Sequence, residues 1–223
     1  MIRLLKNIYR YFYRRLLKWR FDHSGLTNSD FTILCNNCVA GVIYHDLGMK
    51  FLSPTINLYI PYPDYIRFLE DPDQYFAGEM TFSRKSRLFP DEVDYPLGII
   101  GDMEIHFIHY HSSAEAKDKW DERKARFNPD NLLIIGSERD GCTAEDMERF
   151  DRLPYSRKVF FSSKKRKDLS SVVYFRKYRN DGQLGDIIEG EEWLNRFDLI
   201  GWLNTGKIKR YHLKRWIFTT IFE

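Results

Sequence analysis

The sequence lacks the marks of several large protein classes. No uninterrupted apolar run reaches the roughly 18 residues that a membrane-spanning helix requires. No Gly-x-Gly-x-x-Gly, Walker or Gly-x-Ser-x-Gly motif occurs, which argues against dinucleotide binding, nucleotide hydrolysis and ordinary serine-hydrolase chemistry. What remains is a chain of 223 residues that is 43% hydrophobic and 16% aromatic, a composition typical of a folded globular protein.

Cysteine is scarce as well. The three cysteines are too few, and odd in number, for a disulfide framework, which favours a reducing, cytoplasmic location. Cys35 and Cys38 have Cys-x-x-Cys spacing, but no second pair is present to complete a zinc site. Because Cys35 ends an apolar run, we expect it to be buried, which argues against a redox pair.

Positive charge is concentrated at the N-terminus. Residues 1–20 carry seven Lys or Arg and no acid, so subtracting seven from the formal net charge of +3 leaves the remaining residues at −4. A body without a net basic charge argues against nucleic-acid binding.

The same N-terminal residues predict a basic amphipathic helix over residues 1–22. One helical stripe within residues 2–20 is apolar and aromatic: Leu5, Ile8, Tyr9, Phe12, Leu16 and Trp19. Two interpretations stay open. The helix either lies on an anionic membrane, as a peripheral contact on the inner face of the cell membrane, or docks on the protein's own surface.

Apolar runs alternate with helical patterns along residues 23–223, which we expect to form a single α/β domain. The predicted strands are Phe31–Leu34, Glu104–Tyr110, Leu132–Gly136, Lys158–Phe161 and Val172–Phe175, with a less regular strand pair over 79–103. The predicted helices are one starting near Val42, Tyr65–Glu70, one from the Ser112–Glu115 capping box to about Phe127, Ala144–Phe150, and a terminal helix with Trp193 and 197–203. This order predicts a three-layer fold with a mostly parallel central sheet.

The triplet Asp71-Pro72-Asp73 has the Asp-x-Asp pattern with which some glycosyltransferases hold a divalent metal. Between two short helical stretches, however, Asp and Pro are ordinary turn and capping residues. We favour the turn and predict no metal site.

The stretch around Cys38 indicates chemistry most strongly. A predicted strand runs into Asn36, Asn37 and Cys38, and a helix is expected to follow. Ligands of open α/β sheets bind at the carboxyl ends of the strands, where a thiol is a candidate nucleophile and neighbouring amides can donate to an oxyanion. Alternatively, Cys38 is a small buried hydrophobe and the two Asn residues form a turn.

Two other loops are expected at the same edge of the sheet. One carries His109, Tyr110 and His111, and the other carries Glu138, Arg139, Asp140 and Cys142. The second loop is either part of a site or a salt-bridged turn. On the helix between these loops, Trp120 and Arg123 share a face, where Arg123 either extends along the apolar surface or binds a carboxylate or phosphate.

Many short motifs in one order carry a family resemblance over about residues 28–205. They include Asn36-Asn37-Cys38, Leu47-Gly48, Ser53-Pro54-Thr55, Pro63-Asp64-Tyr65-Ile66, Ile105-His106-Phe107, Glu138–Thr143 and Trp202-Leu203-Asn204. The chain thereby resembles the bacterial family called domain of unknown function 1919, whose members are often named exopolysaccharide or capsular polysaccharide biosynthesis proteins. It departs from the family at Val39-Ala40, where a Trp-Gly-like pair is usual. Asn37-Cys38 is also similar to the Gly-Asn-Cys nucleophile motif of a capsule-associated acetyltransferase family.

The candidate residues and the resemblance together leave two functional interpretations open. In the first, Cys38 attacks an acyl donor such as acyl-CoA, a histidine from 109–111 activates it, Glu138 or Asp140 orients that histidine, and the acyl group passes to a sugar hydroxyl. In the second, the protein is a non-catalytic sugar-binding or assembly protein at the membrane surface. No cofactor is firmly implied, and the expected partner is a carbohydrate or sugar-linked molecule. The expected binding residues are Asn36, Asn37 (the oxyanion donor), Tyr110, Trp120, Arg123, Arg139 and Cys142.

Overall fold

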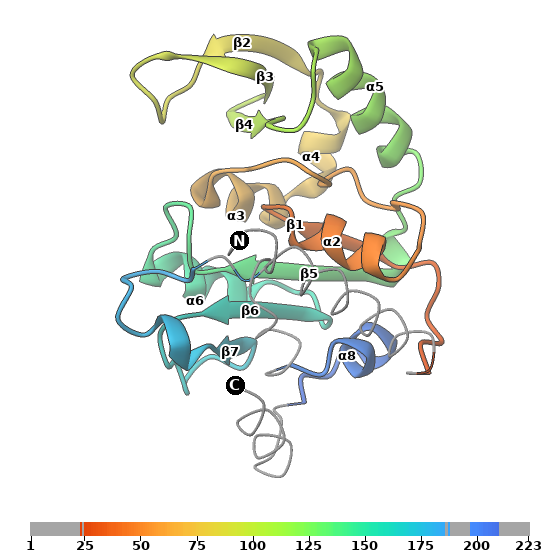
Figure 1. Ribbon diagram of the computed structural model, residues 1–223, viewed down its shortest axis with the longest axis vertical. Helices are drawn as coiled ribbons and strands as arrows, with labels where there is room; N and C mark the ends of the chain where they lie inside the picture. The colour runs from red at the N-terminus through yellow and green to blue at the C-terminus, as the bar shows by residue number, and fades with distance from the viewer. Residues whose placement is uncertain (1–22, 24, 186, 188–196, 210–223) are drawn as a thin grey trace, which may run out of the picture.

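The computed structural model describes residues 23, 25–185, 187 and 197–209 (Figure 1). The predicted basic helix over residues 1–22 lies outside the described residues, as does Trp193. None of the helices in the described ranges is long and apolar enough to cross a bilayer.

A four-stranded parallel sheet forms one part of the fold. Its strands, in the order in which they hydrogen-bond, are β1 (Thr32–Cys35), β5 (Leu132–Ser137), β6 (Lys158–Ser162) and β7 (Val172–Tyr174). All four agree with the predicted strands to within two residues at each end. β5 lies between β1 and β6, where the unbroken apolar run Leu132–Gly136 is buried from both sides after the half-buried Leu132, as expected for a central parallel strand.

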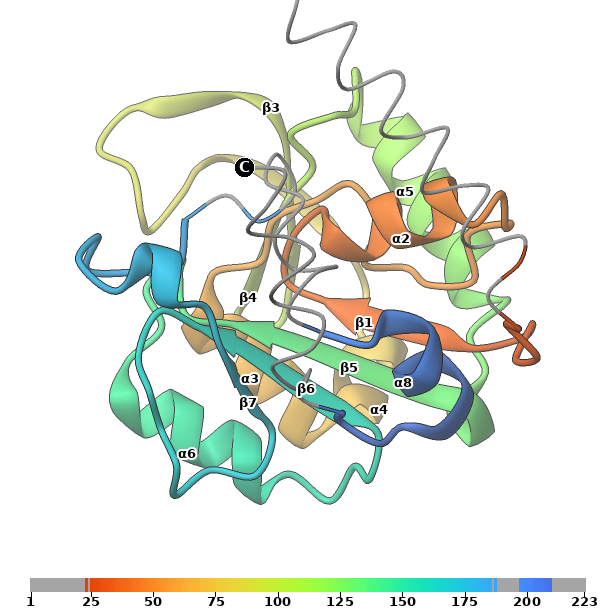
Figure 2. The ribbon, with the colours of Figure 1, turned by 60° about the horizontal axis from the view of Figure 1, so that its bottom comes forward.

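Helices cover both faces of this sheet (Figure 2). They are α3 (Tyr62–Glu70) and α6 (Ala144–Arg152) on one face, and α2 (Val39–Asp46) and α8 (Leu199–Thr205) on the other. Successive residues of β5 alternate between the two cores, with Ile134 packed among residues of α3 and α6 and Ile135 among residues of α2 and α8. Two short 3-10 helices, η1 (Pro129–Asn131) and η2 (Arg176–Tyr178), lie in the connections.

A small antiparallel sheet lies at the other end of the molecule (Figure 1). Its strands are β2 (Thr81–Lys85), β3 (Glu92–Ile100) and β4 (Met103–His106), in that order. The predicted strand pair over residues 79–103 is confirmed, but the prediction of a strand Glu104–Tyr110 in the parallel sheet is wrong. Gly101, at φ 59°, turns the chain within two residues, so β4 pairs antiparallel with β3 and ends at His106.

Two further helices pack near the small sheet. They are α4 (Pro72–Ala77) and α5 (Ser113–Lys124). Asp71 caps α4 by accepting a hydrogen bond from the Gln74 N–H at 3.2 Å, which confirms the turn interpretation of the Asp71–Asp73 triplet. Ser112 caps α5, as predicted, by accepting from the Glu115 N–H at 3.1 Å.

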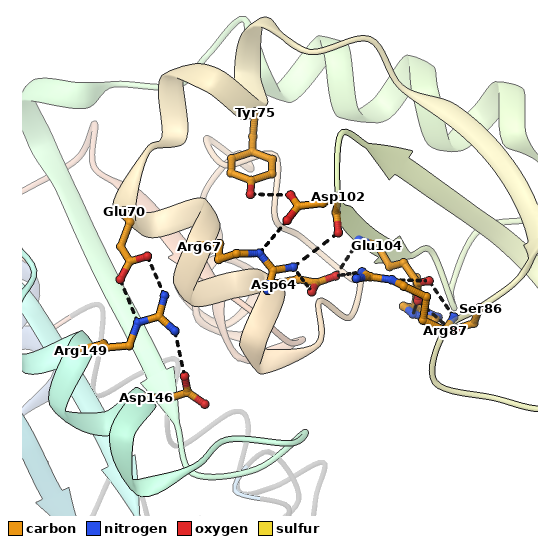
Figure 3. Close-up of polar contacts among 11 residues, drawn as sticks. Asp64, Arg67, Glu70, Tyr75, Ser86, Arg87, Asp102, Glu104, Asp146 and Arg149 are labelled. Carbon is orange, nitrogen blue, oxygen red and sulfur yellow. Dashed lines mark hydrogen bonds and ion pairs between the residues drawn. The ribbon is translucent and has the colours of Figure 1, made fainter.

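Buried charges join the small sheet to α3 (Figure 3). Asp64 of α3 accepts from Arg67 at 2.6 Å, from Arg87 at 2.5 Å, and from the backbone N–H of Glu104 in β4 at 2.8 Å. The Glu104 carboxylate in turn accepts from the Arg87 N–H at 2.7 Å and from the Ser86 hydroxyl at 2.8 Å. These contacts set the position of β4, and therefore of the turn that follows it.

Candidate active site

Cys38 lies where β1 gives way to α2. It is the N-cap residue of this eight-residue helix, and its carbonyl accepts from the Val42 N–H at 3.1 Å. The strand and the helix predicted on either side are both present. The thiol is partly exposed, at the carboxyl edge of the parallel sheet and at the positive end of the α2 dipole.

His109 reaches the thiol from the small-sheet end of the molecule. Its Nε2 lies 3.5 Å from Cys38 Sγ, although the two residues are 71 positions apart. The sequence left the choice between His109 and His111 open, and the geometry selects His109. His111 is exposed at the start of α5, where its backbone N–H donates to Glu115 at 2.9 Å.

Asn37 holds the loop before α2 together. Its Oδ1 accepts from the Val39 N–H at 3.1 Å and from the Cys35 thiol at 3.2 Å, and its Nδ2 donates to Ser137 Oγ at 3.1 Å. The side chain expected to bind the oxyanion is therefore engaged with protein groups at both ends.

Asn36 and Asp140 connect this loop to β5. Asn36 is fully buried and donates to Asp140 Oδ2 at 3.3 Å. Asp140 adopts a left-handed backbone conformation, φ 62°, and its carbonyl accepts from the Tyr62 N–H at 2.9 Å. Burial raises the pKa of Asp140, outweighing the opposing effects of Arg139 and Asn36.

Glu138 faces the end of β6. Its carboxylate accepts from Ser162 Oγ at 2.8 Å, from the Ser163 N–H at 2.7 Å and from Lys164 Nζ at 2.8 Å. Although burial would raise its pKa, the hydrogen bonds from these three residues hold the pKa of Glu138 below its usual range.

No carboxylate among the described residues contacts His109, so the expected histidine-orienting role of Glu138 or Asp140 has no geometric support. The physical reason is topological. Both acids follow β5 and are engaged by groups of the neighbouring β1 and β6 segments, whereas His109 arrives from the separate small sheet.

The family follows from comparison with known sequences. The model of the family described as "Domain of unknown function (DUF1919)" matches residues 8–204, most of the chain. The chain belongs to the DUF1919 family. It is similar to an uncharacterized protein of Haemophilus influenzae, with 38% identity over 200 residues that cover 87% of this chain and 92% of the relative.

The three thiols of this DUF1919 chain differ in their surroundings. Burial raises the pKa of the Cys35 thiol to about 12. Burial, together with the nearby carboxylates of Asp146 and Glu138, raises the pKa of Cys142 far above its usual range, so this thiol is a poor nucleophile. Cys38 is the thiol that has an imidazole beside it.

The predicted binding residues outside the Cys38 loop have mixed placements. Arg139 is half-buried and donates to Asp140 at 3.2 Å and to the Gly185 carbonyl at 3.4 Å. Trp120, expected to bind substrate, is 2% exposed and packs in the core against Phe76 and Phe107. Tyr110 and Arg123 are also buried, and they contact each other.

A ring cluster around His106 of the DUF1919 chain was not predicted from the sequence. Tyr95 OH lies 3.0 Å from His106 Nδ1, and the Tyr59 and Phe89 rings lie 5.1 Å and 5.8 Å from the imidazole. Burial, with the charge of Asp140, raises the pKa of Tyr59 to about 12. The only signal in the sequence was a histidine within an apolar run, because the rings come from three separate segments.

No group of three or more His, Cys, Asp or Glu side chains that could hold a metal ion is present within the described residues.

Proposed function

We propose that this protein is an acyltransferase of exopolysaccharide or capsule biosynthesis that uses Cys38 as a nucleophile. The observation that carries the proposal is the 3.5 Å contact between Cys38 Sγ and His109 Nε2. A thiol paired with an imidazole at a helix N-terminus is the arrangement that activates cysteine in enzymes. The polysaccharide context comes from the family resemblance.

The proposed reaction has two steps. His109 accepts the Cys38 proton, the thiolate attacks the carbonyl carbon of an acyl-CoA, and the CoA thiol leaves with the proton returned by His109. A sugar hydroxyl, deprotonated by His109, then attacks the Cys38 thioester. This attack releases the acylated sugar and restores the thiol. The dipole of α2 favours negative charge at Cys38.

The test is acylation of the purified protein by acetyl-CoA, followed by peptide mass spectrometry to locate the acyl group. Wild-type protein should carry it on Cys38. Cys38→Ser should lower transfer by about three orders of magnitude, because a hydroxyl without a tuned base is a weaker nucleophile. His109→Gln should lower it by at least about a hundredfold.

Two control variants make the test specific. His111→Gln removes the neighbouring imidazole, and Cys142→Ser removes the other partly buried thiol. Both should acylate at the wild-type rate. Acylation on Cys142 with Cys38 unmodified would refute the proposal.

We further propose that residues 2–20 attach the protein to an anionic membrane. The seven basic residues of the first twenty should contribute about 1 kcal/mol each near such a surface. The full chain should sediment with anionic vesicles at low salt, and less so as salt screens the charges. A chain beginning at His23 should not, and equal sedimentation of the two would contradict the proposal.

A second candidate, a non-catalytic sugar-binding protein, is favoured by the rings around His106. Tyr59 and Tyr95 are partly exposed and Phe89 is 46% exposed, which gives a sugar aromatic faces to pack against. Saccharide binding by a protein that acetyl-CoA leaves unmodified would support this candidate over the first.

A further inference from the structure

His109 occupies an exposed turn that is anchored by its neighbours. Ile108 is 42% exposed and His109 is also exposed, whereas Phe107 and Tyr110 are buried. The Tyr110 N–H donates to the Phe107 carbonyl at 3.0 Å, and the two rings meet edge to face at 5.1 Å. The position of the imidazole therefore depends on how Tyr110 is held.

Arg123 of α5 holds Tyr110. Its Nη1 donates to the Tyr110 hydroxyl and, at 3.2 Å, to the Ile56 carbonyl, to which the Tyr110 hydroxyl also donates at 2.8 Å. The guanidinium lies over the Phe51 and Tyr110 rings, at 5.3 Å and 5.8 Å from their centroids. Two oxygen acceptors and two nearby rings therefore hold the guanidinium.

The segment at Ile56, to which Arg123 donates a hydrogen bond, also packs against α2. Asn57 follows Ile56, and a Cβ added at Gly41 of α2 would lie 2.5 Å from Asn57 Oδ1. The Ile56 carbonyl is thus a common reference point. It accepts a hydrogen bond from Tyr110, the residue after His109. The adjoining Asn57 lies against α2, the helix that Cys38 caps.

No acidic partner accounts for the burial of Arg123 within the described part of the protein. The residue is 8% exposed, and no carboxylate pairs with it among the described residues. Burying a cation without an acidic partner costs free energy that hydrogen bonds to neutral groups recover only in part. Packing alone would be served by an apolar side chain.

We infer that Arg123 is a positioning residue that, through Tyr110, holds His109 at the Cys38 thiol. The inference rests on the proposed role of the Cys38–His109 pair. It replaces the expectation that Arg123 binds a ligand carboxylate or phosphate. Lys cannot reproduce the function, because it lacks the planar guanidinium that lies near both rings while donating to two oxygens.

The test measures, as a function of pH, the rate at which iodoacetamide alkylates Cys38. Peptide mass spectrometry identifies the alkylated residue. At neutral pH, Arg123→Lys should alkylate about tenfold more slowly than wild type, because displacement of His109 removes the base. At alkaline pH the two rates should converge, since hydroxide ionises the thiol in both proteins. Tyr110→Phe, which keeps the ring, should show a smaller shift of the same kind.

Arg126→Lys is the matched control, because this arginine lies just after the same helix and pairs with Glu122 at 2.9 Å. Its pH profile should equal that of wild type. A normal profile for Arg123→Lys, with or without a lower melting temperature, overturns the inference, and so does a rate loss that is equal at every pH. If His109→Gln leaves the alkylation rate of Cys38 unchanged, the proposed function fails instead.

Discussion

The two sheets of this protein share apolar packing, but the small sheet is held by buried charges as well. In the parallel sheet, residues such as Ile134 and Phe160 are fully buried, and aliphatic and aromatic packing covers both faces. The small antiparallel sheet has an outer strand, β2, that is largely exposed, and it is joined to α3 by the buried acids Asp64 and Glu104 with Arg87.

The difference shows how the candidate site is assembled. Cys38 extends from the apolar sheet, whereas His109 follows β4, whose position relative to α3 depends on directional polar contacts in addition to the packing of Met103 and Ile105. Apolar packing tolerates small shifts, while a charge-assisted hydrogen bond specifies both distance and direction. Loss of these polar contacts should therefore disturb the thiol–imidazole pair more than its cost in global stability suggests.

The largest effect is expected for Phe160→Ala in the parallel sheet. Phe160 is fully buried, with the Phe150 and Tyr62 rings at 5.2 Å and 5.9 Å, so the cavity should cost about 4 kcal/mol of unfolding free energy. Urea denaturation measures the loss. Phe82→Ala on the half-buried β2 should cost no more than about 2 kcal/mol. Equal losses would mean that the two sheets are packed alike.

A smaller loss of stability but a larger effect on the site is expected for Asp64→Asn. Removing this charge takes one of two carboxylate partners from Arg67, which keeps Asp102, and from Arg87, which keeps Glu104, at a cost of about 3 kcal/mol. Alkylation of Cys38 should slow several-fold under native conditions, because β4 and His109 shift. Asp91 is exposed and lies between β2 and β3, so Asp91→Asn should change neither the unfolding free energy nor the alkylation rate. A normal alkylation rate in Asp64→Asn would show that the polar contacts do not position His109.

The smallest effect is a pH dependence carried by Glu104. Although burial would raise its pKa, hydrogen bonds from Arg87 and Ser86 hold that pKa below its ordinary value of 4.5. The unfolded chain therefore binds the proton more readily, so Glu104 stabilises the fold above that value and the contribution is lost as pH falls through the folded-state pKa. A tenfold difference in proton affinity between the unfolded and folded states corresponds to about 1.4 kcal/mol of stability.

Unfolding free energies measured at a series of acidic pH values check this prediction. The wild-type protein should lose stability in that range more steeply than Glu104→Gln, which carries no titrating group at this position. Parallel curves for the two proteins would show that Glu104 does not contribute to the acid sensitivity of the small sheet.

Local patterns in the sequence were sufficient for most of the elements. The four parallel strands, the helix after Cys38, the Ser112 cap and the Thr143 cap of α6 were all predictable, because apolar periodicity and capping chemistry act over a few residues. The position of Cys38 at a strand end, before a helix, followed from the same signals. Membership of the DUF1919 family followed from the order of its short motifs.

The partners of the site residues were decided by tertiary structure alone. The two-residue turn at Gly101 pairs β4 with β3 and not with the parallel sheet, and in the turn after β4 it is His109, not His111, that lies beside the thiol. Glu138 accepts hydrogen bonds from the serines at the end of β6 and does not reach His109, because β6 is the neighbour of β5 in the sheet. Spacing along a chain cannot encode such choices. They depend on which strands pair and on which buried polar groups must find a hydrogen-bonding partner.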